Sequence, residues 1–246
     1  MRTTIVVAAS LAGTLAACSP QPAGPSASEF ATVRDLPLVE APVSDTVRGH
    51  DLAIFLTGDQ LVAAGIPVVG FNSRDFLKRR RTPDQTADAV TRVIRHYSDA
   101  WGRDSLVLVG YSRGADILPF VVNRLPPDLV DRTRVVALLA PARRAGFKFH
   151  WADLLTNVSS PDDLPILPQV DSISGPKVLC FYGKKEKESL CRQDLPPSVA
   201  VYARNGGHHF DGNYVEIGDL IVQALDAGRT PLTRSTHPDS IPDPRR

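Results

Sequence analysis

Short apolar runs, rich in valine, leucine and isoleucine, alternate along the chain with longer segments that have helical periodicity. Apolar runs of this length, bounded by turn residues, predict buried strands. They occupy residues 52–56, 67–71, 106–109, 135–139, 178–181 and 199–202. Strands that alternate with helices favour a mostly parallel sheet with helices on both faces. The pattern therefore predicts an α/β fold.

Two segments carry the clearest helical pattern. In the first, Thr82 is suited to cap a helix, Pro83 to occupy its first turn and Gln85 to complete a capping box. Apolar residues then recur every three or four positions, which predicts an amphipathic helix. The same spacing recurs over residues 214–226. Both helices are expected to pack on the sheet through their apolar sides.

The N-terminus has the features of a bacterial lipoprotein leader. Arg2 precedes an uncharged, mostly apolar run, residues 5–17, that is too short to span a membrane comfortably. The run ends in Leu-Ala-Ala-Cys, which resembles a lipobox, the motif whose cysteine is diacylated and becomes the new N-terminus. We expect residues 1–17 to be a signal peptide and Cys18 to be the lipidation site. The expected location is the periplasm, with the domain anchored to a bacterial membrane.

The composition divides the rest of the chain into three parts. Residues 18–30 are rich in Pro, Ala and Ser and are expected to form a flexible tether. Residues 31–227 contain the strand and helix patterns and form one expected domain. Residues 228–246 are polar and contain several prolines, so we expect a disordered tail.

The charge balance of the chain does not suggest a nucleic-acid partner. The 246 residues have a formal net charge of +1, and 43% of them are hydrophobic. The apolar fraction is enough for a sizeable core, and the bulk charge gives no reason to expect nucleic acid.

The remaining cysteines, Cys180 and Cys191, are expected to form a disulfide. An exported protein meets an oxidising compartment, where a nearby pair persists in the oxidised state. The alternative is two free, buried thiols. No pair of Cys or His residues has zinc-finger spacing, so we expect no metal.

Residues 110–114, Gly-Tyr-Ser-Arg-Gly, have the pattern of a nucleophile elbow. They follow the apolar run 105–109 and precede the helix-compatible segment 115–123. This strand–turn–helix context exposes a nucleophilic serine, here Ser112, and the flanking glycines leave room for the sharp turn. The backbone N–H of the next residue, Arg113, is then one oxyanion donor. The alternative is an ordinary glycine-rich turn.

A serine nucleophile on this fold needs a carboxylate and then a histidine later in the chain. The loop after the expected strand 178–182 carries Glu186 and Glu188, at the end of a strand where open α/β sheets place their sites. Glu186 is the first choice for the acid and Glu188 the alternative, with Asp194 and Asp211 as fallbacks. A solvated loop charge is the competing interpretation.

The histidine is expected in residues 205–212, Asn-Gly-Gly-His-His-Phe-Asp-Gly, which follow the last expected strand. The paired glycines allow the loop to turn sharply toward the edge of the sheet. His208 is the expected general base, and His209 is able to exchange roles with it. For either residue the alternative is a structural histidine that binds the loop backbone.

A basic run, residues 78–81, follows the expected strand 67–71 on the same side of a parallel sheet as the serine. Arg79, Arg80 and Arg81 are therefore candidates to bind a lipid phosphate. The alternative is a solvated charge run that assists contact with a membrane surface.

Residues 143–169 interrupt the alternation of strands and helices. They contain Phe147, Phe149 and Trp151, followed by a loop rich in Pro and Asp. We expect either a lid over the site or a surface excursion that its aromatic residues pack onto the core.

Four segments together resemble one known family. They are residues 110–120, residues 123–126, the Cys180-to-Cys191 segment with its Tyr-Gly pair, and residues 206–210. The chain resembles the VirJ/AcvB bacterial virulence protein family over about residues 50–225. The run around Ser112 is the most specific part of the match.

The resemblance implies a periplasmic protein of the α/β-hydrolase fold, linked to virulence and type IV secretion. The family is linked to hydrolysis of aminoacylated phosphatidylglycerol, notably the lysyl form. Ser112 matches the family's serine, and His208 or His209 its histidine. We expect a serine esterase with a phospholipid substrate and no cofactor. The alternative is a non-catalytic periplasmic adaptor that contacts secretion-system proteins and uses the fold as a scaffold.

One stretch departs from the family's pattern. The family reads Gly-Asp-Gly-Gly-Trp after its third strand and continues into a helix, whereas here Gly58 and Asp59 run directly into residues 60–67. A parallel crossover with its helix needs about 10 to 12 residues or more, so we expect a helix of about one or two turns. The second oxyanion donor comes from this loop, at Gly58 or Asp59.

Overall fold

A computed structural model describes residues 3–9, 30–32, 60–61, 63–72, 76–148 and 160–227 of the chain. Several expectations fall outside these residues: lipidation at Cys18, nearly all of the tether, the strand at 52–56, the loop at Gly58 and Asp59, and the tail from residue 228.

A seven-stranded sheet forms the centre of the protein, in the order β2-β3-β1-β4-β5-β8-β9. Every neighbouring pair of strands is parallel. The strands are β1 (Thr3–Ala9), β2 (Phe30–Thr32), β3 (Val68–Asn72), β4 (Ser105–Tyr111), β5 (Thr133–Leu139), β8 (Lys177–Gly183) and β9 (Val199–Arg204). Because all strands run the same way, their carboxyl ends meet at one edge.

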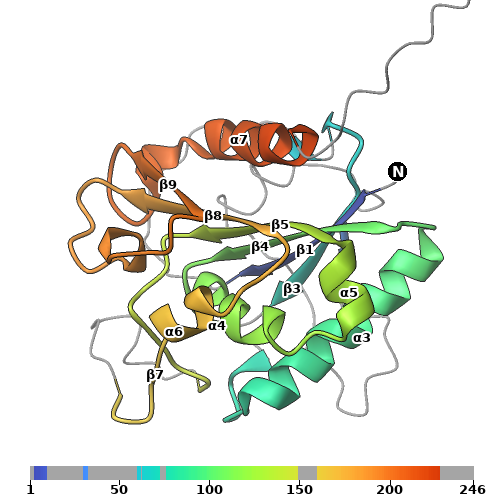
Figure 1. Cartoon of the computed structure of the whole chain (residues 1–246), viewed down its shortest axis with the longest axis horizontal. Helices are drawn as coiled ribbons and strands as arrows, with labels where there is room; N and C mark the ends of the chain where they lie inside the picture. Colours follow the sequence, from blue (N-terminus) through green and yellow to red (C-terminus); the bar gives the residue numbers. More distant parts are fainter. Residues whose placement is uncertain are drawn as a thin grey trace, which may run out of the picture.

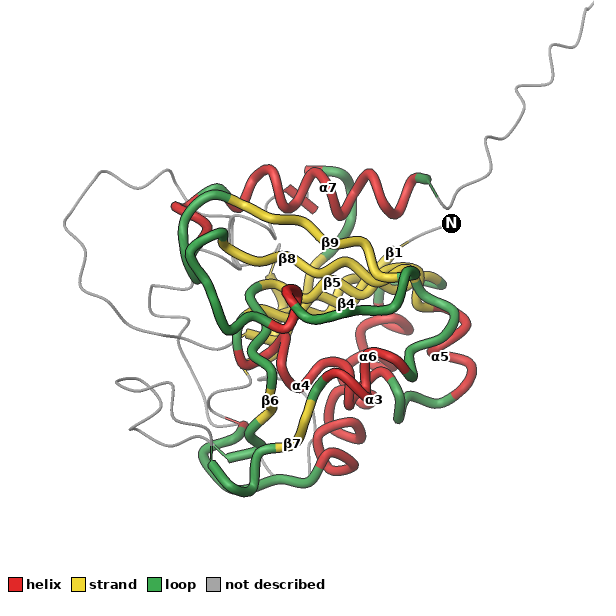
Figure 2. The backbone as a smooth tube through the Cα atoms, turned by 60° about the vertical axis from the view of Figure 1, so that its left-hand side comes forward, coloured by secondary structure: helices red, strands yellow, loops and turns green. Residues whose placement is uncertain are grey.

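Helices cover both faces of the sheet, as the sequence predicted. Figures 1 and 2 show α7 on one face and the helices α3 to α6 on the opposite face. The helices on that second face are α3 (Pro83–Ala100), α4 (Arg113–Val122), α5 (Pro127–Arg132) and α6 (Leu167–Asp171), whereas α7 spans Tyr214–Asp226.

The sheet separates two apolar cores. Along β4, Leu106 and Leu108 pack into the core shared with α3 and α4, while Val107 and Val109 pack into the core shared with α7. All four side chains are at most 1% exposed. A strand buried on both faces has an unbroken apolar sequence rather than an alternating one, which is what the sequence of β4 shows.

The strands expected at 67–71, 106–109, 135–139, 178–181 and 199–202 are confirmed, each within a few residues of its expected bounds. The helix after Thr82 is confirmed with both halves of its capping box. Gln85 N donates to Thr82 Oγ1 at 3.1 Å, and Thr82 N donates to Gln85 Oε1 at 3.0 Å. The short helices α5 and α6 were not predicted, because five or six residues are too few to display a helical period.

The segment after β5 contains a two-stranded antiparallel ribbon of β6 (Arg144–Ala145) and β7 (Leu164–Pro165). Figure 2 shows this ribbon set apart from the main sheet. Phe147 is 8% exposed and packs edge-on against Phe120 of α4, with ring centroids 5.2 Å apart. The described base of the excursion is therefore packed onto the core. Phe149 and Trp151 lie outside the described residues.

The disulfide between Cys180 and Cys191 is confirmed, with Cα atoms 5.6 Å apart. It joins β8 to the 3-10 helix η3 (Leu190–Arg192). The loop between the two cysteines contains Glu186, so the cross-link closes the loop that carries the expected acid.

Strand β1 lies within residues 1–17, the segment expected to be a signal peptide. It pairs with β3 on one side and with β4 on the other. Cleavage before Cys18 would remove this strand and leave two facing strands without the one that joins them. The apolar run 52–56 has the composition of a buried parallel strand and is long enough to pair there.

We predict that a chain that starts at Cys18 remains folded, with the run 52–56 in the position of β1. Ile54→Pro should then unfold the shortened chain, because proline cannot donate to a central ladder. The same substitution should leave the full chain folded. Circular dichroism and thermal melting of the four proteins test this. Equal tolerance of Ile54→Pro in both lengths would show that the run does not replace β1.

Candidate active site

Ser112 occupies a sharp turn between β4 and α4. Its backbone has φ 52° and ψ −122°, a region that non-glycine residues rarely occupy. Such a conformation costs about 1–3 kcal/mol and persists only where the surroundings hold it. Ser112 N donates to Leu139 O of β5 at 2.8 Å, which is one such restraint. A Cβ atom on Gly110 would lie 2.5 Å from Gly114 O, so the turn requires glycine there.

The structure brings Ser112, His208 and Glu186 into one hydrogen-bonded chain. His208 Nε2 lies 2.8 Å from Ser112 Oγ. On the other side of the ring, His208 Nδ1 lies 2.8 Å from Glu186 Oε1. The three residues come from the loops that follow β4, β8 and β9, and all lie at the carboxyl edge of the sheet. The order along the chain is serine, acid, histidine, as the sequence analysis expected.

Glu186 is held by a tight turn at the end of β8. Its backbone N donates to Gly183 O at 2.8 Å, and its Oε2 accepts from Gly183 N at 2.8 Å. A Cβ on Gly183 would lie 2.1 Å from Gly207 O, so glycine lets this turn approach the histidine loop. Glu188, the alternative acid, points elsewhere and pairs with Arg143 at 3.0 Å.

His209 contacts tyrosines rather than the serine. Its Nδ1 lies 2.8 Å from Tyr111 Oη and 3.4 Å from Tyr214 Oη, and Tyr111 Oη donates to His208 O at 3.2 Å. The Tyr111 hydroxyl thus bridges the His209 ring and the backbone carbonyl of His208. Burial, and then the neighbouring His208, lower the pKa of His209 and favour its neutral form. This series of hydrogen bonds fixes the backbone of His208.

Neither fallback acid belongs to the hydrogen-bonded chain. Asp211 lies on the 3-10 helix η4 (Phe210–Gly212), and a Cβ on Gly206 would meet its Oδ1 at 2.3 Å. Asp194 follows η3 without a described contact to the histidines.

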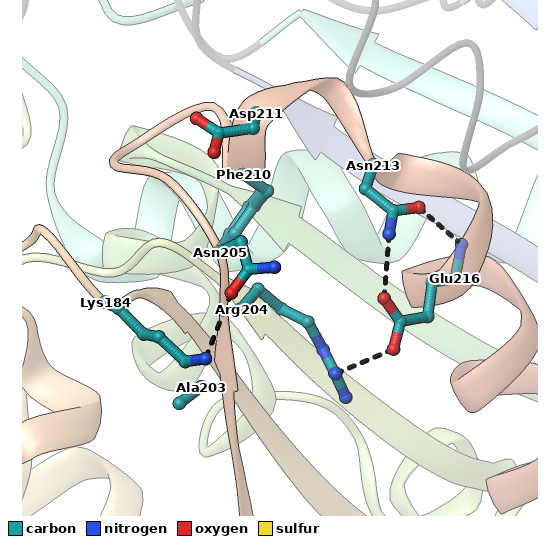
Figure 3. A pocket seen from close by; sticks show the side chains of 8 residues that line it. All are labelled: Lys184, Ala203, Arg204, Asn205, Phe210, Asp211, Asn213 and Glu216. Carbon is teal, nitrogen blue, oxygen red and sulfur yellow. Dashed lines mark hydrogen bonds and ion pairs between the residues drawn. The ribbon is translucent and has the colours of Figure 1, made fainter.

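A cavity of about 330 Å³ lies beside the histidine loop (Figure 3). Two pairs of polar residues in its lining contact each other: Arg204 Nη1 contacts Glu216 Oε1 at 2.7 Å, and Lys184 Nζ donates to Asn205 Oδ1 at 3.0 Å. Ser112, His208 and Glu186 do not line this cavity. The cavity is therefore a neighbour of the site and not the site itself.

A buried carboxyl group stands one helical turn after the serine. Asp116 N donates to Ser112 O at 3.0 Å, and Asp116 Oδ1 accepts from Ala142 N at 2.7 Å. Burial raises the pKa of Asp116 to about 7, against the lowering effects of that hydrogen bond and of Arg113. Sequence analysis missed Asp116 and Tyr111, although both lie within the run 110–120 that carried the resemblance.

Arg113 follows the serine and begins α4, so its backbone N–H has the position of the first oxyanion donor in this fold. Gly58 and Asp59, expected to supply the second, lie outside the described residues. In the described part of that connection, residues 60, 61 and 63 are helical and a turn at 64–65 leads toward β3. This part amounts to about one helical turn, and the residues before 60, where the expected helix would begin, lie outside the described residues.

The basic residues expected to bind substrate lie beside the 143–165 segment. Arg80 pairs with Asp162 at 2.5 Å, and Arg81 stacks over the Phe76 ring with its Cζ atom 4.8 Å from the centroid. Arg79 is exposed. The contacts that the structure records for these arginines do not include Ser112, His208 or Glu186.

Among the described residues, no cluster of His, Cys, Asp and Glu is suited to hold a metal ion. Within the same residues, no helix has the length and apolar character needed to cross a membrane.

Comparison with known proteins agrees with this geometry. The family described as bacterial virulence protein (VirJ) matches residues 53–229. No curated protein gives a significant match.

Three solved structures with similar folds are esterases. An esterase from Pyrococcus furiosus has a TM-score of 0.53 at 10% identity, over 92% of this chain and 80% of that one. Est1E from Butyrivibrio proteoclasticus with bound ferulic acid has a TM-score of 0.51 at 10% identity, over 92% of this chain and 89% of that one. The esterase domain of a Rhodothermus marinus protein has a TM-score of 0.51 at 11% identity, over 92% of this chain and 87% of that one. At such identities the likeness shows the fold alone, which is the α/β-hydrolase fold.

Asp116 predicts a specific dependence of stability on pH. Its pKa is higher in the folded chain than its ordinary value of 3.8, so the folded state binds the proton more tightly. The free energy of unfolding therefore falls as pH rises from about 4 to about 7. Asp116→Asn retains an acceptor for Ala142 N and does not titrate. Relative to wild type, this variant should gain up to about 4 kcal/mol across that interval, at 1.36 kcal/mol per pKa unit.

Urea unfolding of both proteins at several pH values measures this difference. A difference between Asp116→Asn and wild type that stays constant from pH 4 to pH 8 would contradict the prediction. Asp128→Asn is a matched control, because Arg95 lowers the pKa of that exposed carboxyl group instead of raising it.

Proposed function

The chain belongs to the bacterial virulence protein (VirJ) family, and on that premise we propose that it is a serine hydrolase of carboxylic esters. The observation that carries the proposal is the hydrogen-bonded chain from Ser112 Oγ through His208 to Glu186. The strained φ of Ser112 adds to it, because strain of this kind concentrates at functional sites. A glycine-rich turn without a function would need neither.

The geometry assigns a role to each residue. Glu186 accepts from His208 Nδ1–H, which leaves Nε2 as the acceptor for the proton of Ser112 Oγ. The serine oxygen attacks the ester carbonyl, and the proton passes to Nε2. The negative oxygen that forms is stabilised by the Arg113 N–H. When the C–O bond to the alcohol breaks, His208 returns the proton to the leaving oxygen. Water then releases the acid from Ser112 by the same steps.

The substrate we propose is an aminoacyl ester of phosphatidylglycerol, such as the lysyl form. Family membership, the lipobox and the basic residues near the site support it. A lipid anchor at Cys18 would hold the domain at a periplasmic membrane surface, within reach of a lipid headgroup. Arg79, Arg80 and Arg81 are the proposed contacts for the lipid phosphate, because guanidinium groups bind phosphate in a bidentate manner.

One observation favours a second function, that of a non-catalytic adaptor in virulence or type IV secretion. After Gly58 and Asp59 the sequence lacks the Gly-Gly-Trp of the family's pattern, and the loop at this place supplies the second oxyanion donor in this fold. Loss of one oxyanion donor costs about 10² to 10³ in turnover. The adaptor would use the same fold as a scaffold for protein contacts.

We predict that wild-type protein hydrolyses p-nitrophenyl acetate and lysyl-phosphatidylglycerol, and that Ser112→Ala lowers kcat by about 10³-fold or more because the nucleophile is lost. Ser172→Ala is the matched control, since this exposed serine only bonds Pro168 O of its own helix. If wild type and Ser112→Ala are equally inactive while Ser112→Ala complements the cell, the adaptor is the correct function.

The acid is tested separately by paired substitutions two residues apart. Glu186→Gln should lower kcat by about 10²- to 10⁴-fold, because the amide no longer fixes the tautomer of His208. Glu188→Gln should leave kcat within about twofold, because Glu188 pairs with Arg143 at the surface. Steady-state kinetics on p-nitrophenyl acetate decide between them, and the reverse order of effects would move the acid to Glu188.

A further inference from the structure

Three loops at the carboxyl edge of the sheet each carry a basic run. Residues 78–81, Lys-Arg-Arg-Arg, follow β3. Residues 143–148, Arg-Arg-Ala-Gly-Phe-Lys, follow β5, and residues 184–187, Lys-Lys-Glu-Lys, follow β8. The chain as a whole has a net charge of only +1. We call these three segments together the basic edge.

Direct contacts join the three segments into one surface. Arg81 N donates to Phe147 O at 2.9 Å, which connects the first segment to the second. Arg143 pairs with Glu188 at 3.0 Å, which connects the second to the loop of the third. Arg113, the residue after the nucleophile, donates from Nη1 to Gly146 O at 3.1 Å. The surface therefore adjoins the serine.

Acidic groups in the same region only partly balance these charges. Glu186 is occupied by His208, Asp162 and Glu188 each pair with one arginine, and Asp163 lies beside Gly146 and accepts from Ser160 N. Arg79 and all three lysines of the segment 184–187 are exposed. A surplus of exposed positive charge remains at this edge.

The opposite edge of the sheet carries charges of both signs in near balance. Near the amino ends of β4, β5 and β8 lie the cations Arg103, Arg132, Arg134 and Lys177 and the carboxylates Asp104, Asp131 and Asp171. On the face of the sheet that α3 and α5 cover, Arg95 pairs with Asp128. The charge of the domain is therefore polarised along the strands, with the positive end at Ser112.

The extent of the basic edge favours a surface over a single anion. Strands β3 and β8 are four positions apart in the sheet, which is about 19 Å at a strand spacing of ~4.8 Å. One phosphate group cannot contact loops that far apart. We propose that the basic edge docks the domain on an anionic phospholipid bilayer and so presents Ser112 to the lipid headgroups.

The choice of a bilayer as the partner rests on the proposed function, in which the substrate is a lipid ester. The uneven distribution of charge along the strands is independent of that proposal. A basic residue close to an anionic membrane strengthens binding by roughly fivefold. Several such residues at one edge also orient the protein, because the opposite edge, with its balanced charge, is not attracted to the anionic membrane.

The test is co-sedimentation of the full chain, made by cell-free synthesis and thus without lipid, with vesicles. Vesicles of pure phosphatidylcholine are compared with vesicles that contain one part phosphatidylglycerol in three. We expect excess binding to the anionic vesicles that disappears near 1 M salt, where the Debye length falls to about 3 Å. Any binding through the apolar leader is common to both vesicle types and cancels in the comparison.

Two triple variants with equal charge changes locate the surface. Lys78→Gln, Lys148→Gln and Lys187→Gln together remove one cation from each segment and should weaken the excess binding about 100-fold. Arg92→Gln, Arg134→Gln and Lys177→Gln remove three exposed cations elsewhere and should change it less than about threefold. Equal losses in both variants, or no excess binding by wild type, would overturn the proposal.

Two further measurements separate docking from catalysis and from general binding of polyanions. Ser112→Ala should bind anionic vesicles as wild type does, so an inactive enzyme that still docks leaves this proposal standing. An active enzyme without excess vesicle binding leaves only the proposed function standing. Heparin is the polyanion control. If the protein binds heparin as tightly as it binds anionic vesicles, and the triple lysine variant weakens both equally, the basic edge is a general polyanion surface and the choice of a bilayer is overturned.

Discussion

The close approach of loop backbones at the carboxyl edge of the parallel sheet is the constraint on which the site depends. Gly110 lets the chain reverse into α4 against Gly114, and Gly183 lets the end of β8 approach the carbonyl of Gly207. A side chain at either glycine would collide with backbone, which has no rotamer to relieve the contact. Because both approaches occur at one edge, the serine, the carboxylate and the imidazole come within hydrogen-bonding distance although they are far apart in sequence.

Further interactions hold that edge in place. The disulfide closes the loop that carries Glu186, and the tyrosine–histidine chain from His209 through Tyr111 supports the carbonyl of His208. Asp116 binds the backbone after β5 from the first turn of α4. These groups restrain the backbone around Ser112, Glu186 and His208. The strain at Ser112 is thus balanced by contacts from strands and helices on both sides of it.

The same topology that assembles the triad also gathers charge. Parallel strands place the loops after β3, β5 and β8 at one edge, and each of these loops is basic. A proposed esterase of membrane lipids needs its nucleophile to face the lipid headgroups, and an electrostatic surface around the nucleophile meets that need. An adaptor would use the same surface without the chemistry. The loop at Gly58 and Asp59 is where the two proposed functions differ, because the second oxyanion donor depends on it.

Much of the architecture could be predicted from the sequence, because strand and helix periods, the capping box at Thr82 and the elbow at Ser112 are local patterns. The α/β-hydrolase fold followed from the resemblance to the family, and the disulfide from the expected export of the chain. Local patterns could not separate Glu186 from Glu188, or His208 from His209, because neighbouring residues on a loop have nearly the same sequence context. Only the tertiary structure decided between them, since contact depends on the direction of each side chain. Tyr111, Asp116 and the continuity of the basic edge were likewise decided by packing, because the residues that contact them lie far away in the sequence.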